Sequence, residues 1–227
     1  MNEHFGPFGS ESAYLFHEMI KEAGDAGEAG RKSYKKGEVI FEEDRHPAKL
    51  YCVIHGKVKV SRLNETGREQ IVRLYGPNEV LGYKSLVMES PYHASATALE
   101  ETQLGFVSKS AFDRIIDTNP RIARLFMKIL CQNLDESENQ LVSLASKNIR
   151  ERVAGALVLL QRKFGLNNDK TLGINLSREE IAGMIGIATE NLSRTLSQFR
   201  DEGIIDALGR KIVILDTEQL EVIRGEI

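Results

Sequence analysis

The segment SREEIAGMIGIATENLSRTLSQFRD, residues 177–201, is the part of the sequence that decides the predicted fold. Ser177 and Glu180 have the spacing of a capping box, which marks the start of a helix. Gly186 breaks this helix, and a second helix is expected from Glu190 to Asp201. Two short helices joined by a tight turn that contains glycine predict a helix-turn-helix.

The second helix of this motif has two faces of different chemistry. Leu192, Leu196 and Phe199 recur at helical spacing and would hold the helix against the core. The opposite face presents a carboxylate, hydroxyls and a guanidinium, carried by Thr189, Glu190, Ser193, Arg194 and Ser197. Such groups suit the reading of base edges when a helix N-terminus enters the major groove of DNA.

A β-hairpin is expected directly after the helix-turn-helix. Residues 204–205 and 212–215 are its strands, and the turn lies at residues 208–211. Near the tip, Arg210 and Lys211 would contact DNA phosphates as a wing does, although such a pair in a turn is often merely solvated. The remaining candidates for DNA contact, at the start of the first helix, are Ser177 and Arg178.

The N-terminal half has a β-rich pattern. Short strands punctuated by glycines are expected at residues 39–41, 50–54, 58–60, 70–74 and 103–107. Several such strands predict an antiparallel sandwich or barrel. Strand patterns alone leave open any other small all-β domain.

Beyond Ser108 the spacing of apolar residues becomes helical. A short helix should stop near Asn119-Pro120, and a long helix is expected over residues 120–145. Its heptad seam is formed by Ala123, Met127, Leu130, Leu134, Ser137, Leu141 and Leu144. A second apolar stripe that could pack on the barrel is formed by Ile122, Leu125, Phe126 and Ile129. Both apolar faces have to be buried, and the polar positions between the seam residues look solvated, which favours a homodimer over a core helix inside a monomer. These polar positions are Asn133, Asp135, Glu136, Glu138 and Asn139.

The bulk composition narrows the class of protein. The net charge is −3 and the isoelectric point about 6.0, so any DNA contact must rest on local clustering of charge. No run approaches the ~20 apolar residues that span a bilayer, and the start lacks a secretion signal, so a cytoplasmic location is expected. Two cysteines, Cys52 and Cys131, cannot form a four-cysteine metal or iron–sulfur site within one chain.

The whole layout resembles the CRP/FNR family of bacterial transcription regulators, over roughly residues 30–216. The motifs that carry the resemblance are KGEVIF at 36–41, HGKVKV at 55–60, YGPNEVLG at 75–82, SREEIA at 177–182 and TENLSR at 189–194. The resemblance implies an α+β fold. A cyclic-nucleotide-binding-like β-roll, or jelly-roll barrel, with an N-terminal helical segment would occupy residues 1–118. A long dimerisation helix would occupy residues 119–146. A C-terminal winged helix-turn-helix domain, which binds DNA, would occupy residues 147–227.

The same resemblance implies roles for particular residues. In the family a glutamate and an arginine four residues apart read DNA, and these fall on Glu190 and Arg194. Ser193 is similar to the fumarate–nitrate branch, which implies an inverted repeat with a TTGA-like half-site. The usual cap of the recognition helix is Ala188 here, which leaves Thr189 as an alternative cap. The dimer interface would comprise Met127, Leu130, Leu134, Ser137, Leu141 and Leu144. The expected partners are double-stranded DNA, a second copy and, for an activator, RNA polymerase, but no membrane.

The effector side departs from the family pattern. Where cyclic-AMP binders have glycine–glutamate and arginine–serine pairs, this sequence has Gly82-Tyr83 and His93-Ala94. Cyclic AMP is therefore disfavoured, and either another effector or a barrel that needs none is expected. The candidate pocket residues are Gly82, Tyr83, Lys84, His93, Ala94 and Ser137.

Metal cofactors are also disfavoured. The cysteine cluster of the oxygen-sensing branch is missing, so no iron–sulfur cluster is expected. A lone histidine is more often a surface residue than a ligand, although haem could in principle be ligated by His17, His46, His55 or His93.

Two other classes of protein compete with a transcription regulator. A cyclic-nucleotide sensor whose C-terminal helices bind protein would not need base-reading residues such as Glu190 and Arg194. An enzyme on a cupin-like barrel needs a close cluster of metal ligands, and His46, His55 and His93 lack that spacing. No nucleophile–base arrangement is evident either, so no catalytic residue and no metal site are expected.

Overall fold

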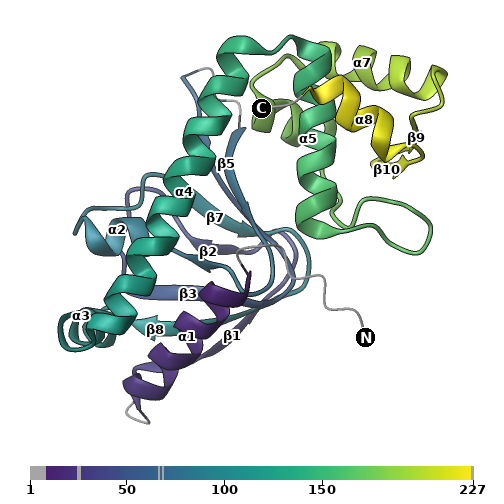
Figure 1. The fold of residues 1–227 in the computed structure, drawn as a ribbon. Helices are drawn as coiled ribbons and strands as arrows, with labels where there is room; N and C mark the ends of the chain where they lie inside the picture. Colours follow the sequence, from purple (N-terminus) through teal and green to yellow (C-terminus); the bar gives the residue numbers. More distant parts are fainter. Residues whose placement is uncertain (1–8, 25–26, 66, 68, 226–227) are drawn as a thin grey trace. The chain divides into compact units, whose positions relative to one another are not determined.

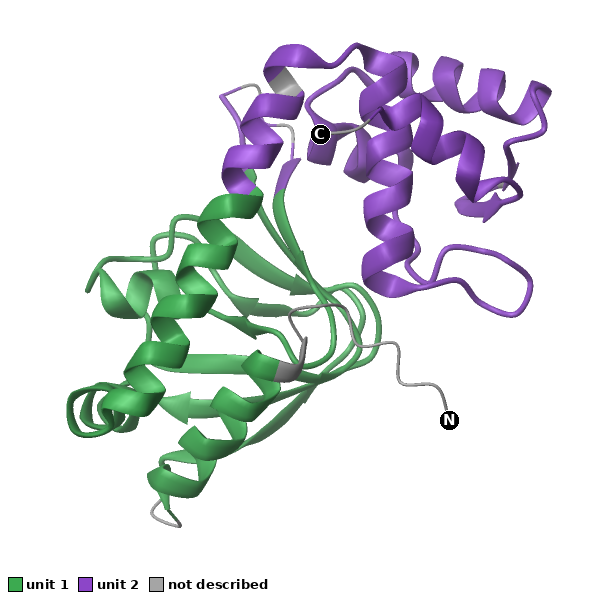
Figure 2. Cartoon of the chain, in the orientation of Figure 1, with its two compact units in different colours: residues 1–62, 72–136 green, residues 63–71, 137–227 purple. Residues whose placement is uncertain are grey.

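The computed structural model describes residues 9–24, 27–65, 67 and 69–225. The chain forms two compact units: residues 1–62 with 72–136, and residues 63–71 with 137–227 (Figure 2). Within the described residues, no helix combines the length and apolar character needed to cross a membrane.

The first unit is built on a β-roll of two four-stranded sheets, with strand orders β1-β8-β3-β6 and β2-β7-β4-β5 (Figure 1). The strands are β1 (Ala29–Tyr34), β2 (Val39–Phe41), β3 (Lys49–His55), β4 (Val58–Leu63), β5 (Glu69–Tyr75), β6 (Val80–Leu81), β7 (Ser95–Ala98) and β8 (Thr102–Ser108). The five strands predicted from the sequence correspond to β2, β3, β4, β5 and β8. Between β3 and β4, Gly56 has φ 89°, and a Cβ there would lie 2.6 Å from the Glu101 carbonyl oxygen. This turn therefore requires glycine.

Helices cover one side of the β-roll. They are α1 (Gly9–Ala23), α2 (Tyr83–Val87), α3 (Lys109–Thr118) and the first part of α4 (Pro120–Ser146). Apolar residues of α1, α3 and α4 form one buried cluster with β3 and β8, to which Leu15, Met19, Leu50, Ile115 and Ile122 contribute. As predicted, α3 stops near Asn119-Pro120: its last residue is Thr118 and Asn119 is its extended C-cap, because Pro120 disfavours a helical residue before it.

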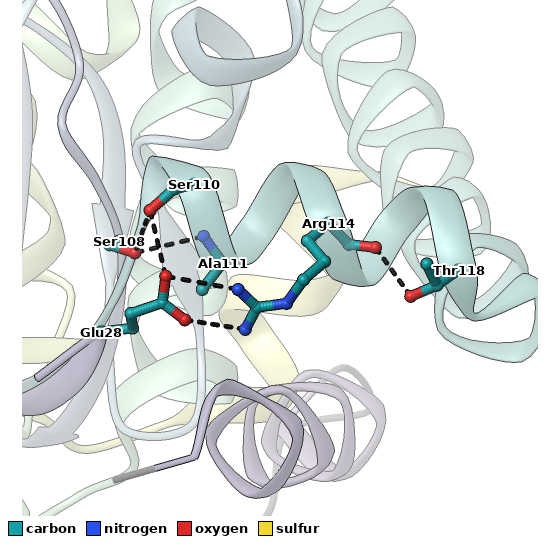
Figure 3. Close-up of polar contacts among 6 residues, drawn as sticks. All are labelled: Glu28, Ser108, Ser110, Ala111, Arg114 and Thr118. Atoms are coloured by element: carbon teal, nitrogen blue, oxygen red, sulfur yellow. Dashed lines mark hydrogen bonds and ion pairs between the residues drawn. The ribbon is translucent and has the colours of Figure 1, made fainter. Parts of the chain in front are cut away.

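Glu28, just before β1, ties the sheet to α3 (Figure 3). Its carboxylate accepts hydrogen bonds from Arg114 at 2.7 and 3.3 Å and from the Ser110 hydroxyl at 3.3 Å. The Arg114 guanidinium lowers the pKa of Glu28 below its ordinary value. At the start of α3, the Ser108 hydroxyl accepts from the Ala111 amide and caps the helix.

Helix α4 has two apolar stripes with different surroundings. Ile122, Phe126 and Ile129 are buried, and the Phe126 ring meets the edges of neighbouring aromatic rings in the first unit. The expectation that this stripe packs on the barrel is confirmed. On the heptad seam, Met127 is 56%, Leu134 58% and Leu141 65% exposed, whereas Leu130 is half-buried and Ser137 exposed. The side chain of Leu144 lies outside the described residues.

The second unit contains α5 (Ile149–Phe164), α6 (Arg178–Ile185), α7 (Thr189–Asp201), β9 (Ile205–Leu208), β10 (Lys211–Ile214) and α8 (Thr217–Arg224). Both side chains of the capping box that Ser177 and Glu180 predict are bonded to the backbone, as they also are for Asn148 and Glu151 at the start of α5. Gly186 ends α6 in the left-handed conformation, at φ 64°. The core of this unit includes Leu157, Ile181, Leu192, Leu196 and Phe199.

Candidate DNA interface and effector site

Helix α7 presents the predicted reading face to solvent. Its buried side is formed by Leu192, Leu196 and Phe199, as expected. On the other side Glu190, Ser193, Arg194 and Ser197 are exposed, and Thr189 is half-buried. Neither Glu190 nor Arg194 forms a hydrogen bond or ion pair with any residue that the structure describes. Their polar groups are therefore available to an external partner.

The N-terminus of α7 has no side-chain cap. Ala188 is the N-cap residue, with the extended backbone typical of that position, and Thr189 is the first residue of the helix. The alternative that Thr189 caps the helix is therefore wrong, because Thr189 already lies inside it. The methyl group of Ala188, at the N-cap position, cannot accept a hydrogen bond. Amide groups of the first turn can donate to an anion such as a DNA phosphate.

The hairpin after α7 has a two-residue turn. Leu208 pairs with Lys211, so the turn consists of Gly209 and Arg210, with Gly209 at φ 61°. Both cationic residues predicted at the tip, Arg210 and Lys211, are exposed. The described part of the chain offers Arg210 no hydrogen-bond partner, and its charge interacts with the nearby Glu179 carboxylate.

The two candidates at the start of α6 already have structural partners. The Ser177 hydroxyl accepts from the Glu180 amide at 3.1 Å and thus caps α6. Arg178 donates through Nη2 to the Gly209 carbonyl oxygen at 3.2 Å, which connects α6 to the wing turn. Burial lowers the pKa of the Arg178 guanidinium, and its Nη1 atom is buried without a partner among the described residues. Arg178 is placed to support the wing.

On the effector side, Tyr83 is buried in a polar network between the β-roll and α4. Its hydroxyl accepts from Asn133 Nδ2 at 2.5 Å and is hydrogen-bonded to Tyr75. From β5, Arg73 reaches across to the side chains of Asn133 and Glu136 on α4. Tyr83 and Arg73 are therefore bonded directly to side chains of α4, and Tyr75 is connected to α4 through Tyr83.

The space left beside this network is small. A cavity of about 20 Å³ remains, with Arg73, Tyr75, Glu79 and Asn133 among its lining residues. That is room for about one water molecule. Pockets for small molecules and cofactors measure roughly 300–1,000 Å³. This cavity is therefore too small to hold a nucleotide.

None of the six predicted pocket residues lines this cavity. Lys84, His93 and Ser137 are exposed, and Ala94 is half-buried. Gly82 is the N-cap of α2 at φ 85°, and Tyr83 alone joins the buried network. Arg73 was not recognised from the sequence, and the expectation that Asn133 and Glu136 are solvated is wrong, because both are half-buried and accept hydrogen bonds from Arg73. The sequence did contain a signal for Arg73. Positions 71, 73 and 75 share one face of β5, and Ile71 and Tyr75 are buried, so Arg73 points inward with them.

A second, open cavity lies at β2 and β3. Its volume is about 310 Å³, and it is lined by Phe41, Arg45, His46 and Tyr51 among others. Phe41 stacks on Tyr92 with ring centroids 3.9 Å apart. His17, His46, His55 and His93 are all exposed, and among the described residues no three His, Cys, Asp or Glu side chains gather as a metal site would require.

Comparisons with known proteins identify two modules. Residues 31–119 match the family described as a cyclic nucleotide-binding domain. Residues 151–223 match the Crp-like helix-turn-helix domain. The first match covers most of the β-roll, and the second covers most of α5 together with α6, α7 and the hairpin of β9 and β10.

Individual relatives are similar over most of the chain. The CRP-like cAMP-activated global transcriptional regulator of Mycobacterium tuberculosis is 30% identical, over 82% of this chain and 84% of that protein. The transcriptional activator protein anr of Pseudomonas aeruginosa is 28% identical, over 84% and 79%. The solved structure of FixK2 from Bradyrhizobium japonicum aligns with a TM-score of 0.77 at 28% identity, over 88% of this chain and 98% of that one. The two curated relatives are transcription regulators rather than enzymes.

The buried tyrosines predict a loss of stability at alkaline pH. Burial raises the pKa of Tyr34 to about 12 and also raises the pKa values of Tyr51, Tyr75, Tyr83 and Tyr92. Unfolded tyrosines ionise near pH ~10. Below that pH these groups are neutral in both states and have no effect. As the pH rises above it, the unfolded state loses protons first, so the free energy of unfolding falls.

We expect the phenolate absorbance of these five tyrosines to appear together with the loss of circular dichroism. In concentrated guanidinium chloride all six tyrosines of the chain should ionise near the ordinary value. Phenolate signals from these five residues at that pH in a fully folded protein would contradict the burial of their side chains.

Proposed function

Since this chain belongs to the CRP/FNR family of DNA-binding transcription regulators, we propose that it acts as a homodimer on an inverted repeat and responds to a signal other than cyclic AMP. The observation that carries the proposal is the exposed face of α7, on which Glu190 and Arg194 have no internal partner among the described residues. A chain whose recognition helix bound protein would have no need of this pair.

The chemistry of this face suits one half-site. Arg194 can donate two hydrogen bonds to guanine O6 and N7, Glu190 can accept from cytosine N4, and Ser193 can contact thymine. Together with the likeness of Ser193 to the fumarate–nitrate branch, this supports a TTGA-like half-site. Thr189 and Ser197 flank these base readers, while Arg210 and Lys211 meet phosphates from the wing.

The exposed seam of α4 supports the homodimer. Met127, Leu134 and Leu141 expose more than half of their side chains in the single chain. A parallel pair of such helices would bury both seams, and the hydrophobic contribution favours association. Leu130 and Ser137 lie on the same seam. Two-fold symmetry would then place the two half-sites about one helical turn, ~34 Å, apart.

A signal other than cyclic AMP is supported by the side chains at the two effector positions and by the small volume of the cavity beside α4. Tyr83 and His93 stand where a nucleotide's ribose and phosphate would need a carboxylate and a guanidinium, and the cavity beside α4 measures about 20 Å³. The open groove at Phe41 and Tyr51 offers the volume that another effector would need. We place the regulator in the cytoplasm, where an activator would contact RNA polymerase.

Replacing both Leu134 and Leu141 by glutamate should give monomers. Facing carboxylates on the seam repel each other and lose the apolar contact. Sizing chromatography with light scattering measures the mass. Asn139→Glu, an exposed position away from the seam, is the matched control and should remain dimeric. A double variant that stays dimeric would rule out this seam as the interface.

Cyclic AMP should not bind with micromolar affinity. A phosphate inside this barrel would lack its arginine, and an unpaired buried charge costs several kcal/mol. Titration calorimetry on the full chain should give no saturable heat. The mycobacterial relative named as cAMP-activated serves as a positive control under the same conditions. A micromolar dissociation constant for this chain would overturn the proposal about its signal.

The two kinds of arginine should affect DNA binding differently. Arg194→Ala should lose ~1–3 kcal/mol per half-site and relax the preference at the guanine. Arg210→Ala should weaken all sequences alike and flatten the dependence on salt, because it removes only a phosphate contact. The measurement is a competition assay at two salt concentrations, with the guanine replaced by each other base.

Two outcomes would count against these assignments. If Arg194→Ala keeps the full guanine preference, α7 is not oriented as proposed. If the wild type binds no DNA under any condition, including after addition of cell extract, a sensor that binds protein becomes the better account.

A further inference from the structure

We propose that Arg152 is a positioning residue for DNA recognition: its guanidinium holds the C-terminus of α6 and thereby sets the turn from which α7 begins. The inference rests on the proposed function only in taking α7 as the recognition helix. Arg152 touches no base and no phosphate in this account. It acts through the backbone that carries the reading face.

The contacts of Arg152 are directed at the turn. From α5, its Nη2 atom donates to the carbonyl oxygen of Ile185, the last residue of α6, and to that of Gly186 at 3.1 Å. The last carbonyls of a helix have no partner within the helix and form the negative end of its dipole. A guanidinium at this position donates charge-assisted hydrogen bonds to two such oxygens.

The turn has few other fixed points. On the α6 side, the Ile187 amide donates to the Ala182 carbonyl oxygen at 3.1 Å. On the α7 side, Ala188 provides no cap, so no N-cap side chain fixes the start of that helix. Three residues, Gly186 to Ala188, separate the two helices. Leu192, Leu196 and Phe199 hold the body of α7 against the core. The direction in which its first turn leaves Ala188 depends in addition on how firmly the end of α6 is held.

The Arg152 side chain is itself held in place. The residue is half-buried, and its Nε atom is buried without a hydrogen-bond partner among the described residues. An unpaired buried donor lowers the free energy of unfolding, so an arginine that only filled space at this position would destabilise the unit. A methionine of similar length would fill the same space without that cost. The two carbonyl contacts are what the arginine adds.

The chain offers a matched control on the same helix. Arg162 of α5 pairs with Glu221 of α8 at 2.6 Å and contacts neither α6 nor α7 through any described ion pair or hydrogen bond. Arg152→Met and Arg162→Met remove the same charge and the same number of donors from α5. Only the first removes the link to the turn.

The first measurement is the ratio of specific to nonspecific affinity. The specific probe is the duplex that the wild type selects from random DNA, and the nonspecific probe is a scrambled duplex. Loss of folded protein lowers both affinities equally and leaves their ratio unchanged, whereas a displaced recognition helix lowers the ratio. We expect Arg152→Met to lower it at least tenfold, Arg162→Met to change it less than twofold, and Arg152→Lys to recover part of the loss.

The second measurement needs no DNA. Hydrogen exchange followed by mass spectrometry should show faster exchange in the peptide covering residues 183–192 in Arg152→Met, but wild-type exchange there in Arg162→Met. A wild type that selects no DNA sequence would refute the proposed function, while the exchange result would still decide the role of Arg152. Wild-type exchange and a wild-type affinity ratio in Arg152→Met would overturn the inference.

Discussion

The packing of one stripe of α4 into the β-roll is the interaction on which the rest of the structure depends. Ile122, Phe126 and Ile129 are buried together with residues of α1, α3 and β3. Because side chains on a helix keep fixed angular positions, burying this stripe also decides which side chains face away. The heptad seam faces outward as a consequence, and Asn133 and Glu136 face Tyr83 and Arg73.

The side chains of the polar network beside that stripe fill the interior next to α4 and bond to one another. Arg73 lies half-buried on a strand where an apolar residue would be the simpler choice, and its Nε atom has no partner among the described residues. A buried guanidinium is tolerated when carboxylate and amide oxygens surround it, as Glu136 and Asn133 do here. The interior that could have admitted a ligand is instead occupied by tyrosine and arginine side chains.

The sequence predicted the features that depend on local rules. Capping residues, the glycine at the end of α6 and helical periodicity act over a few positions, so Ser177, Gly186 and the seam of α4 could be recognised without coordinates. Strands β1, β6 and β7 were missed, because their pairing depends on distant strands rather than on their own composition. The network of Arg73, Asn133 and Glu136 was missed for the same reason, since it joins residues about 60 positions apart. Arg178 was predicted to contact DNA, but its hydrogen bond to the Gly209 carbonyl oxygen joins residues 31 positions apart and became visible only in three dimensions.

The missing side-chain cap at Ala188 separates two properties that usually change together. A cap is worth ~1 kcal/mol to a helix, so the first turn of α7 frays more readily in the free protein than a capped turn would. The same amides stay open to an anion, and a capping side chain at residue 188 would compete with that anion for them. A substitution at residue 188 would therefore change the affinity for every DNA sequence alike while the base-reading side chains stay unchanged. The strength of binding and the choice of site can then be adjusted at different positions of the chain.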